Sequence, residues 1–123
     1  MASNVIDQKI ATVQTTDATQ TTCGTYTVPL ATVINVTMYI EAYSAAAGDA
    51  KVFQLVGGIE RIAGGAVVCG SILNLITAQG TAGATTWSVT ADVSGNDLRV
   101  RVTGALATTI NWMSRMVVDS HTP

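Results

Sequence analysis

The stretch 87-WSVTADVSGNDLRVRVTG-104 has the pattern of two short strands joined by a tight turn, and it decides the fold class. With Gly95 and Asn96 as the central turn residues, every apolar residue faces an apolar partner, in the pairs Val93–Leu98, Ala91–Val100 and Val89–Val102. A Gly-Asn pair suits the primed turns that match the twist of paired strands. The sequence therefore predicts a β-hairpin with Gly95 and Asn96 at its tip.

The two arginines of this hairpin lie on its polar side. In the predicted register Arg99 faces Asp92 and Arg101 faces Thr90, away from the face that carries Trp87. A cross-strand ion pair of this kind contributes roughly 0.2–1 kcal/mol. The net charge of −2 also disfavours a nucleic-acid partner, because neutralisation of phosphates supplies most of that affinity. We interpret the arginines as the solvated face of a sheet, not as a stripe that binds phosphate.

A second strand pattern is 33-VINVTMYIEAY-43, in which apolar and polar residues alternate. One face carries Ile34, Val36, Met38, Ile40 and Ala42, which is the period of a half-buried strand and predicts a central position in a sheet. The opposite face carries Tyr39, Glu41 and Tyr43. Exposed tyrosines are frequent interface anchors, so these three residues are a possible subunit or receptor contact, with ordinary surface packing as the alternative.

The stretch 110-INWMSRMVV-118 predicts another strand, whose apolar face is interrupted by Ser114. Together with the hairpin it gives the expected core, which comprises Trp87, Val89, Val100, Val102, Ile110 and Trp112. The alternative for the two tryptophans is stacking on sugar rings in a glycan site.

The middle of the chain carries two less regular features. Gly57 and Gly58 interrupt an extended run, which predicts a bulge or a sharp bend. The run 66-AVVCGSILNLITAQ-79 is almost continuously apolar, so we expect it to be buried on both faces or packed against a neighbouring subunit.

Counting these runs gives seven or eight strands with no convincing helix. We therefore expect an all-β chain, a single-domain antiparallel β-sandwich or barrel-like fold over residues 1–123. Residues 1–20 are expected to be an extended N-terminal segment. Residues 119–123 are expected to be a polar tail that is loose or used in a contact.

Charged residues are scarce, at 11% of the chain against about 25% in typical soluble domains. Threonine keeps much of the surface polar and favours extended structure. With so few charges a monomer would expose much apolar area, and such patches mark interfaces. We therefore expect a homo-oligomer.

Catalytic, cofactor and metal signatures are not found in the sequence. His121 is the only histidine and sits near the end of the chain, and the two glutamates and six aspartates fall mostly at turns or on polar faces. The glycine pairs at 57–58 and 64–65 do not precede a helix, as a phosphate-binding loop would require. Cys23 and Cys69 fit no zinc pattern, and we expect them to be free and packed, or else joined in a disulfide. We expect a protein that is not an enzyme and has no cofactor.

No signal-peptide core and no apolar run of bilayer-spanning length is present, since Asp7 and Lys9 break the N-terminal stretch. We expect a chain made in the cytoplasm, with no membrane partner.

Three runs, 15-TTDATQTT-22, 48-GDAKVFQLVGGIERIAGG-65 and 85-TTWSVTADVSGNDLRVRVTGALATTINWMSRMVV-118, resemble a module of tailed-bacteriophage virion proteins, found in tail fibres and other particle-surface proteins. Residues 87–112 carry this resemblance most specifically. It implies an all-β, trimeric structural protein exposed on a phage particle. Because the chain begins with its own methionine and has no shaft sequence, we expect a capsid decoration or cement protein, or a small fibre subunit.

The leading hypothesis is thus a non-enzymatic virion protein that stabilises the particle through oligomeric β contacts, with itself and the major capsid or tail proteins as partners. The alternative is a tail-fibre tip that binds a host receptor or surface glycan through Tyr39 or Tyr43. A shell-forming coat protein would need basic strands and terminal helices, which are not evident. A polysaccharide-degrading enzyme is the most remote option.

Overall fold

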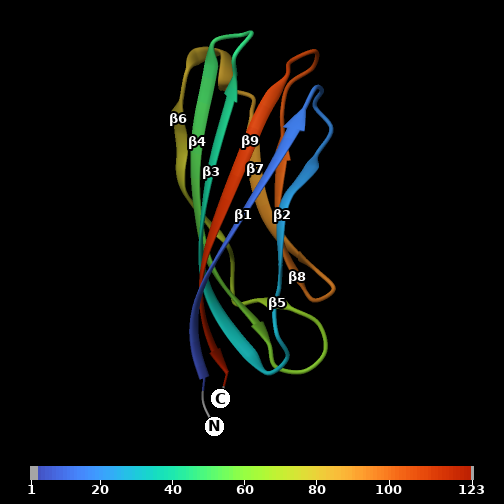
Figure 1. The fold of residues 1–123 in the computed structure, drawn as a ribbon, viewed down its shortest axis with the longest axis vertical. Helices are drawn as coiled ribbons and strands as arrows, with labels where there is room; N and C mark the ends of the chain where they lie inside the picture. The colour runs from blue at the N-terminus through green and yellow to red at the C-terminus, as the bar shows by residue number, and fades with distance from the viewer. Residues whose placement is uncertain (1–2, 123) are drawn as a thin grey trace.

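A computed structural model describes residues 3–122 and shows an all-β molecule made of two antiparallel sheets (Figure 1), which confirms the predicted fold class. The described residues form nine strands, one or two more than predicted: β1 (Ser3–Thr15), β2 (Thr21–Thr27), β3 (Thr32–Ser44), β4 (Asp49–Arg61), β5 (Val67–Val68), β6 (Leu73–Gly80), β7 (Ser88–Ser94), β8 (Asp97–Thr103) and β9 (Ile110–Thr122). One 3-10 turn, η1 (Ala82–Ala84), precedes β7.

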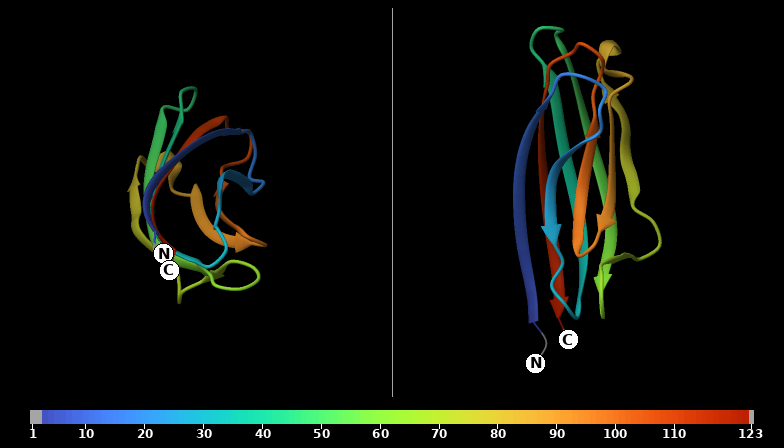
Figure 2. Two further views of the ribbon diagram at one scale, coloured as in Figure 1. Left: turned by 60° about the horizontal axis from the view of Figure 1, so that its bottom comes forward. Right: turned by 90° about the vertical axis from the view of Figure 1, so that its right-hand side faces the viewer.

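The larger sheet, called sheet A here, has the order β1-β9-β3-β4, with β5 and β6 both paired to the far edge of β4. The smaller sheet, sheet B, has the order β2-β8-β7. Sheet A curves around sheet B, so that the molecule has an open, barrel-like cross-section (Figure 2). The first and last strands of the chain are neighbours in sheet A, and both chain ends lie at the same pole (Figures 1 and 2).

Strand β3 lies in the middle of sheet A because its alternation buries one complete face. It pairs with β9 on one side and with β4 on the other. Every second residue from Thr32 to Ser44 is buried, while the residues between them are exposed or half-buried. Burying a valine, isoleucine or methionine side chain contributes about 1.5–3 kcal/mol, so this strand supplies a large part of the core energy. The predicted central strand is confirmed.

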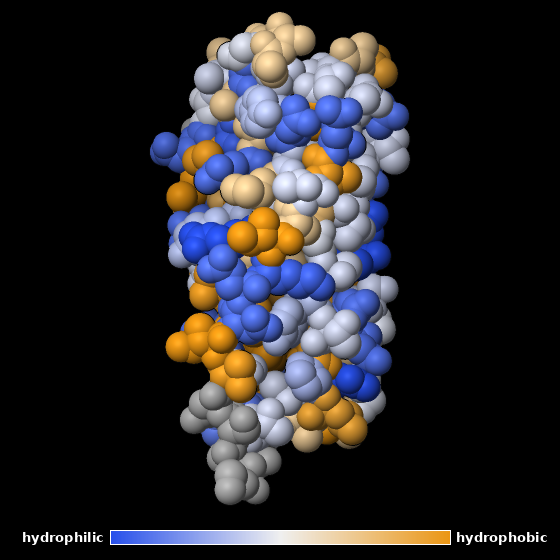
Figure 3. Space-filling model, viewed as in Figure 1, coloured by the Kyte–Doolittle hydropathy of each residue, from blue (hydrophilic) through white to orange (hydrophobic). Residues whose placement is uncertain are grey.

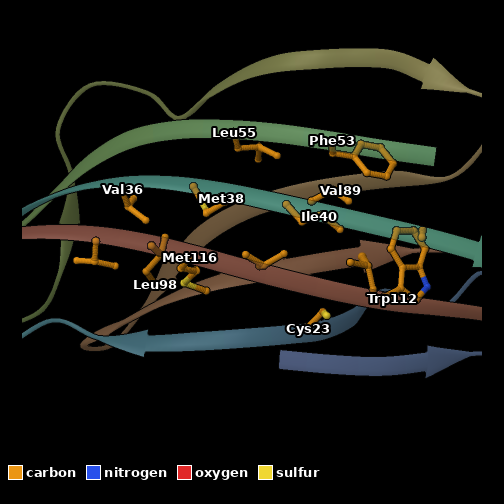
Figure 4. Packing of buried hydrophobic residues seen from close by; sticks show 14 of the residues in the cluster. Cys23, Val36, Met38, Ile40, Phe53, Leu55, Val89, Leu98, Trp112 and Met116 are labelled. Atoms are coloured by element: carbon orange, nitrogen blue, oxygen red, sulfur yellow. The ribbon is translucent and has the colours of Figure 1, made fainter. Parts of the chain in front are cut away.

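The hydrophobic core fills the space between the two sheets (Figure 4). Met38 and Ile40 from β3, Met116 from β9 and Leu98 from β8 all point into this space. The ring of Trp112 lies 6.2 Å from the ring of Phe53, measured between centroids. The predicted core residues Trp87, Val89, Val100, Val102, Ile110 and Trp112 are each at most 5% exposed. The two tryptophans therefore offer no ring to a sugar.

The hairpin formed by β7 and β8 has the pairs read from the sequence, including Asp92 with Arg99. Gly95 has φ +59°, which the first central position of a type II′ turn requires. The Nε and Nη2 atoms of Arg99 donate to the two carboxylate oxygens of Asp92 at 2.8 and 2.9 Å. The hydrogen bonding to Asp92 raises the pKa of Arg99 above its ordinary value.

A bulge in β2 explains why a serine, Ser114, lies on the apolar face of β9. The register of β2 against β8 shifts between Thr22 and Thr25, and Gly24 has φ +110°. The shift turns the carbonyl oxygen of Cys23 towards β9, where it accepts a hydrogen bond from the buried hydroxyl of Ser114. A Cβ on Gly24 would lie 2.8 Å from the Ser114 Oγ. The serine is thus the partner of a backbone carbonyl that the bulge leaves without a strand neighbour.

Lys51 is the buried charge of the core and ties β4 to the segment before β7. It is 8% exposed, and its Nζ donates to the carbonyl oxygen of Trp87 at 2.9 Å. The same Nζ lies 5.2 Å from the centroid of the Phe53 ring. A buried ammonium needs such partners, because an unpaired one would carry a large desolvation cost.

Three sequence-based expectations are wrong in part. No bulge occurs at Gly57 and Gly58 in the β3–β4 ladder, since β4 pairs through them without a shift; Gly57 instead makes room for Ile72, whose Cγ1 would lie 2.9 Å from an added Cβ. The run 66–79 is not buried on both faces, because it forms β5 and β6 at a sheet edge and most of its described side chains are exposed; its packing against a neighbouring subunit stays a prediction. Residues 119–122 are not a loose tail but the last part of β9, held between β1 and β3.

Candidate functional site

The outer face of sheet B is polar throughout. It presents Ser88, Thr90, Asp92 and Ser94 from β7, Asp97, Arg99, Arg101 and Thr103 from β8, and Thr22, Thr25 and Thr27 from β2. These side chains bond to one another, as Thr27 Oγ1 does to Asp97 Oδ1 at 2.6 Å and Gln20 Nε2 does to Thr90 Oγ1 at 3.3 Å. The face is a polar surface with a few hydrogen bonds between its side chains, and the buried Nε of Arg101 has no hydrogen-bond partner among the described residues.

The outer face of sheet A is mixed, with apolar side chains among polar ones. Its exposed hydrophobic residues include Ile6, Ile10, Val33, Tyr43, Val52, Val67, Leu73 and Met113. Figure 3 shows hydrophobic residues of one side of the molecule gathered beside the N-terminal end. Two depressions on this face, one towards each pole, are the candidate sites.

The first depression, the Tyr43 groove, lies across β1, β9 and β3 near the β3–β4 turn. It encloses about 590 Å³ and is lined by Thr12, Val13, Gln14, Glu41, Tyr43, Asn111, Trp112 and Met113. Tyr43 is 55% exposed and so presents much of its ring to the groove. Glu41 lies two residues earlier on the same face of β3. The structure thus brings two of the three predicted contact residues together.

Tyr39, the third predicted residue, lies apart from the groove lining. The guanidinium carbon of Arg115, its partner on β9, lies 4.5 Å from the centroid of the Tyr39 ring. Such a cation–π contact covers the ring face, and Tyr39 is half-buried. Of the two tyrosines, Tyr43 is therefore the one open to a partner.

The groove offers an aromatic ring, a carboxylate and two amides within one open surface. Gln14 Nε2 donates to Asn111 Oδ1 at 3.0 Å, which fixes both amides across the β1–β9 pair. That bond leaves the Gln14 carbonyl oxygen and the Asn111 amino group for other partners. A ring flanked by fixed hydrogen-bonding groups can hold a flat, hydroxyl-rich molecule. Glu41 is the only carboxylate among the residues that line the groove.

The second depression, the Ile6 hollow, lies at the pole of the chain ends and is mainly apolar. It encloses about 500 Å³ and is lined by Val5, Ile6, Val33, Ile34, Asn35, Gly58, Cys69, Asp119, Ser120 and His121. Although Cys69, Asp119 and His121 share this lining, the part of the chain that the structure describes holds no group of three side chains suited to a metal ion.

The two cysteines are both free thiols, as expected, but they differ in environment. Cys69 is exposed and was expected to be packed, whereas Cys23 is buried in the core. Burial raises the pKa of the Cys23 thiol above its ordinary 9.0, against an opposing effect of its hydrogen bonds with Ser114. Cys23 therefore stays protonated and unreactive at neutral pH.

Sequence reasoning missed most of the groove. Thr12, Gln14, Asn111 and Met113 belong to strands at opposite ends of the chain, and no local pattern indicates that these strands pair. In the residues covered by the structure, no helix is long and apolar enough to cross a bilayer.

No protein-family model and no curated protein matches this chain. The solved structures that are similar to this chain include two tailspike proteins. A tailspike protein, gp49, from Acinetobacter baumannii bacteriophage Fri1, a capsular polysaccharide depolymerase, matches 98% of this chain and 19% of its own at 17% identity, with a TM-score of 0.49. The tailspike protein of Acinetobacter baumannii phage AM24 matches 95% of this chain and 26% of its own at 9% identity, with a TM-score of 0.46. The chain thus spans about a fifth to a quarter of the length of these two tailspike proteins.

The expectation that the chain is not an enzyme is contradicted by the first comparison, because that tailspike is a capsular polysaccharide depolymerase. The expectation rested on the absence of a local catalytic motif. Such an absence is weak ground in a β protein, because an active site there can be assembled from distant strands or from several chains.

Proposed function

We propose that this chain is a structural subunit of the surface of a phage particle, a capsid decoration or cement protein or a small fibre subunit, acting as one β domain in a homo-oligomer. The observation that carries the proposal is the outer face of sheet A, which exposes Ile6, Ile10, Val33, Val52 and Met113 in a chain with few charges. The sequence resemblance over residues 87–112 supplies the phage context.

Large apolar side chains on one face of a sheet favour a contact with another protein surface. The polar outer face of sheet B would then be the side turned to solvent. On this proposal the particle surface binds sheet A, and the major capsid or tail proteins are the partners.

Fractionation of purified particles tests the proposal. Virions are separated into heads and tails, and this chain is quantified in each fraction by mass spectrometry and located by antibody labelling in electron micrographs. Enrichment in heads supports a decoration protein, and enrichment in tails supports a fibre subunit. Absence from washed particles would refute both.

A second candidate function is favoured by the Tyr43 groove, whose exposed ring, Glu41 and paired amides suit a host surface glycan. Labelled full chain should bind host cells or their purified surface polysaccharide, and Tyr43→Ala should lower that binding about tenfold, since aromatic anchors carry much of such affinity. Ile62→Ala is the matched control, because Ile62 is 58% exposed and lies outside the groove. Equal binding by both variants would exclude the groove as the glycan site.

A further inference from the structure

Strand β1 is the longest regular sheet edge among residues 3–122. It pairs with β9 over thirteen residues without a register shift, and none of the described strands forms a backbone ladder with its other side. The opposite edge of sheet A is irregular, because the pairing of β6 with β4 shifts register twice. The outer edge of sheet B is the seven-residue, polar β7. A long flat edge presents every second N–H and C=O for pairing with another strand.

The free part of this edge also carries exposed apolar side chains. Val5, Ile6 and Ile10 are 50%, 80% and 56% exposed. The free part ends at Ala11, whose carbonyl oxygen accepts a hydrogen bond from the Cys23 thiol of β2. Ile6 also forms one wall of the Ile6 hollow, so the apolar edge continues into an apolar depression.

The sequence of this edge is complementary to itself about Gln8. In an antiparallel pair of two copies related by a twofold axis at Gln8, residue i lies opposite residue 16 − i. Asp7 then faces Lys9 of the second copy, and Lys9 faces Asp7, while each Ile6 faces an Ile10. Opposite charges and apolar pairs directly across two strands both stabilise a ladder. In such a twofold contact, every pair away from the axis occurs twice, once from each copy.

The neighbouring registers place like charges together. Moving the axis to position 7 sets Asp7 against Asp7, and moving it to position 9 sets Lys9 against Lys9. Charges on an exposed edge usually deter pairing with other strands. Here the spacing of the two charges deters the neighbouring registers and favours the one centred on Gln8.

We propose that two copies of this chain associate through antiparallel pairing of their β1 edges, centred on Gln8, with reciprocal Asp7–Lys9 ion pairs and Ile6–Ile10 contacts. The pairing joins the two A sheets into one continuous sheet across the dimer. The inference rests on the proposed function only for the expectation that the chain self-associates. It gives a twofold dimer in place of the trimer that the sequence resemblance implies.

The mass of the full chain in solution is the first measurement. Light scattering after size exclusion, at concentrations of about 1–100 μM, should give twice the 12.7 kDa of one chain. Asp7→Lys and Lys9→Asp should each raise the dimer dissociation constant at least about tenfold, because each places two like-charge pairs in the interface. Mixing the two variants should restore dimers, because every lysine of one variant then faces an aspartate of the other. Glu60→Lys, on β4, changes the net charge as Asp7→Lys does and should leave the dimer intact.

A disulfide test reports the register itself. In a Cys69→Ala background, Gln8→Cys should form a cross-linked dimer on mild oxidation, because residue 8 faces its own copy and opposed Cβ atoms lie about 4.5–5.5 Å apart. Thr12→Cys is the matched control and should not cross-link, because position 12 faces position 4.

A monomer, a trimer, or a dimer that Asp7→Lys leaves unchanged would each overturn the proposal. So would cross-linking at position 12 and not at position 8. These measurements use the purified chain alone, so they are independent of whether the chain is found in virions.

Discussion

The two outer faces of this molecule are built from the same kind of strand, yet they differ in what they expose. The outer face of sheet B presents serine, threonine, aspartate and arginine side chains, of which two pairs, Thr27–Asp97 and Arg99–Asp92, are hydrogen-bonded. Sheet A exposes isoleucine, valine, methionine and tyrosine side chains and is hollowed at two places. The inner faces of both sheets supply apolar side chains to one shared core, and the buried polar residues among them, such as Lys51 and Ser114, belong to sheet A. The difference supports the proposal that sheet A is the face that contacts partners.

The contact between the two sheets is the most sensitive point of this arrangement. Gly24→Ala should lower the free energy of unfolding by roughly 2–4 kcal/mol, since the added Cβ combines a strained φ with a clash. That Cβ would lie 2.8 Å from Ser114 Oγ and 3.2 Å from Ala11 Cβ. Chemical denaturation followed by tryptophan fluorescence measures the change.

Gly48→Ala is the control for backbone strain alone. Gly48 has φ +70°, and an added Cβ there meets nothing within 4 Å. Its cost should be about 1 kcal/mol. Equal losses of unfolding free energy in Gly24→Ala and Gly48→Ala would show that the bulge of β2 is not in close contact with β9.

Making sheet A resemble sheet B should remove self-association and leave the fold intact. The double change Ile6→Thr with Ile10→Thr should raise the dimer dissociation constant about tenfold or more. It should change the free energy of unfolding by less than about 0.5 kcal/mol, since both side chains are exposed in the single chain. Sedimentation equilibrium at several concentrations gives the constant.

The reciprocal change is the control. Thr22→Ile adds an apolar side chain to the outer face of sheet B, at an exposed position of β2. It should leave the dissociation constant as it is. A similar weakening by Thr22→Ile would show that the A face has no special part in association.

The ion pair of sheet B should matter little for stability. Asp92→Ala should cost about 0.5 kcal/mol or less, because the pair is partly solvated, with side-chain exposures of 47% for Asp92 and 27% for Arg99. The unfolding midpoint of this variant should also depend less on salt than that of the parent chain. A loss of several kcal/mol would mean that sheet B depends on this pair to hold its shape.

The smallest expected effect is a pH dependence on the alkaline side. The folded chain raises the pKa of Cys23 through burial, and that of Tyr26 through burial and the charge of Asp7. A raised pKa in the folded state means that stability is complete below the ordinary values of 9.0 and 10.0 and is lost as pH rises through the folded values. Thermal unfolding between pH 7 and pH 11 should show a midpoint that declines only above about pH 9.

Two variants separate these contributions. Cys23→Ala should flatten the first part of the decline, and Asp7→Asn should lower the pKa of Tyr26 in a spectroscopic titration of tyrosine. A midpoint that falls between pH 7 and pH 8 would contradict this assignment.

Local sequence patterns predicted the parts of the fold that depend on residues close together in the chain. The partners of Asp92 and Val89 follow from a two-residue turn, and the buried face of β3 follows from strict alternation. The pairing of β1 with β9 joins residues such as Gln14 and Asn111, which are far apart in the chain, and no local signal encodes it. Ser114 interrupts the apolar face because it serves a bulge in another sheet, which a single-strand reading cannot show.

The candidate site was likewise predictable only where it depends on residues of a single strand. Glu41 and Tyr43 were found because they share one face of one strand. Whether a tyrosine is open depends on the strand beside it, and Arg115 covers Tyr39 only because β9 lies next to β3. The groove and the hollow are properties of the sheet, so they emerge only once the strand order is known.

The neighbouring chain ends have a practical consequence. Ser3 lies opposite Thr122 in the β1–β9 ladder, and both ends leave the molecule at one pole (Figure 2). A short peptide joining them would convert β1 and β9 into a hairpin, and the chain could then be opened at Gly48 in the β3–β4 turn. Such a circular permutant would keep every strand pairing while carrying its new ends beside the Tyr43 groove, where a fused peptide would be displayed at the opposite pole.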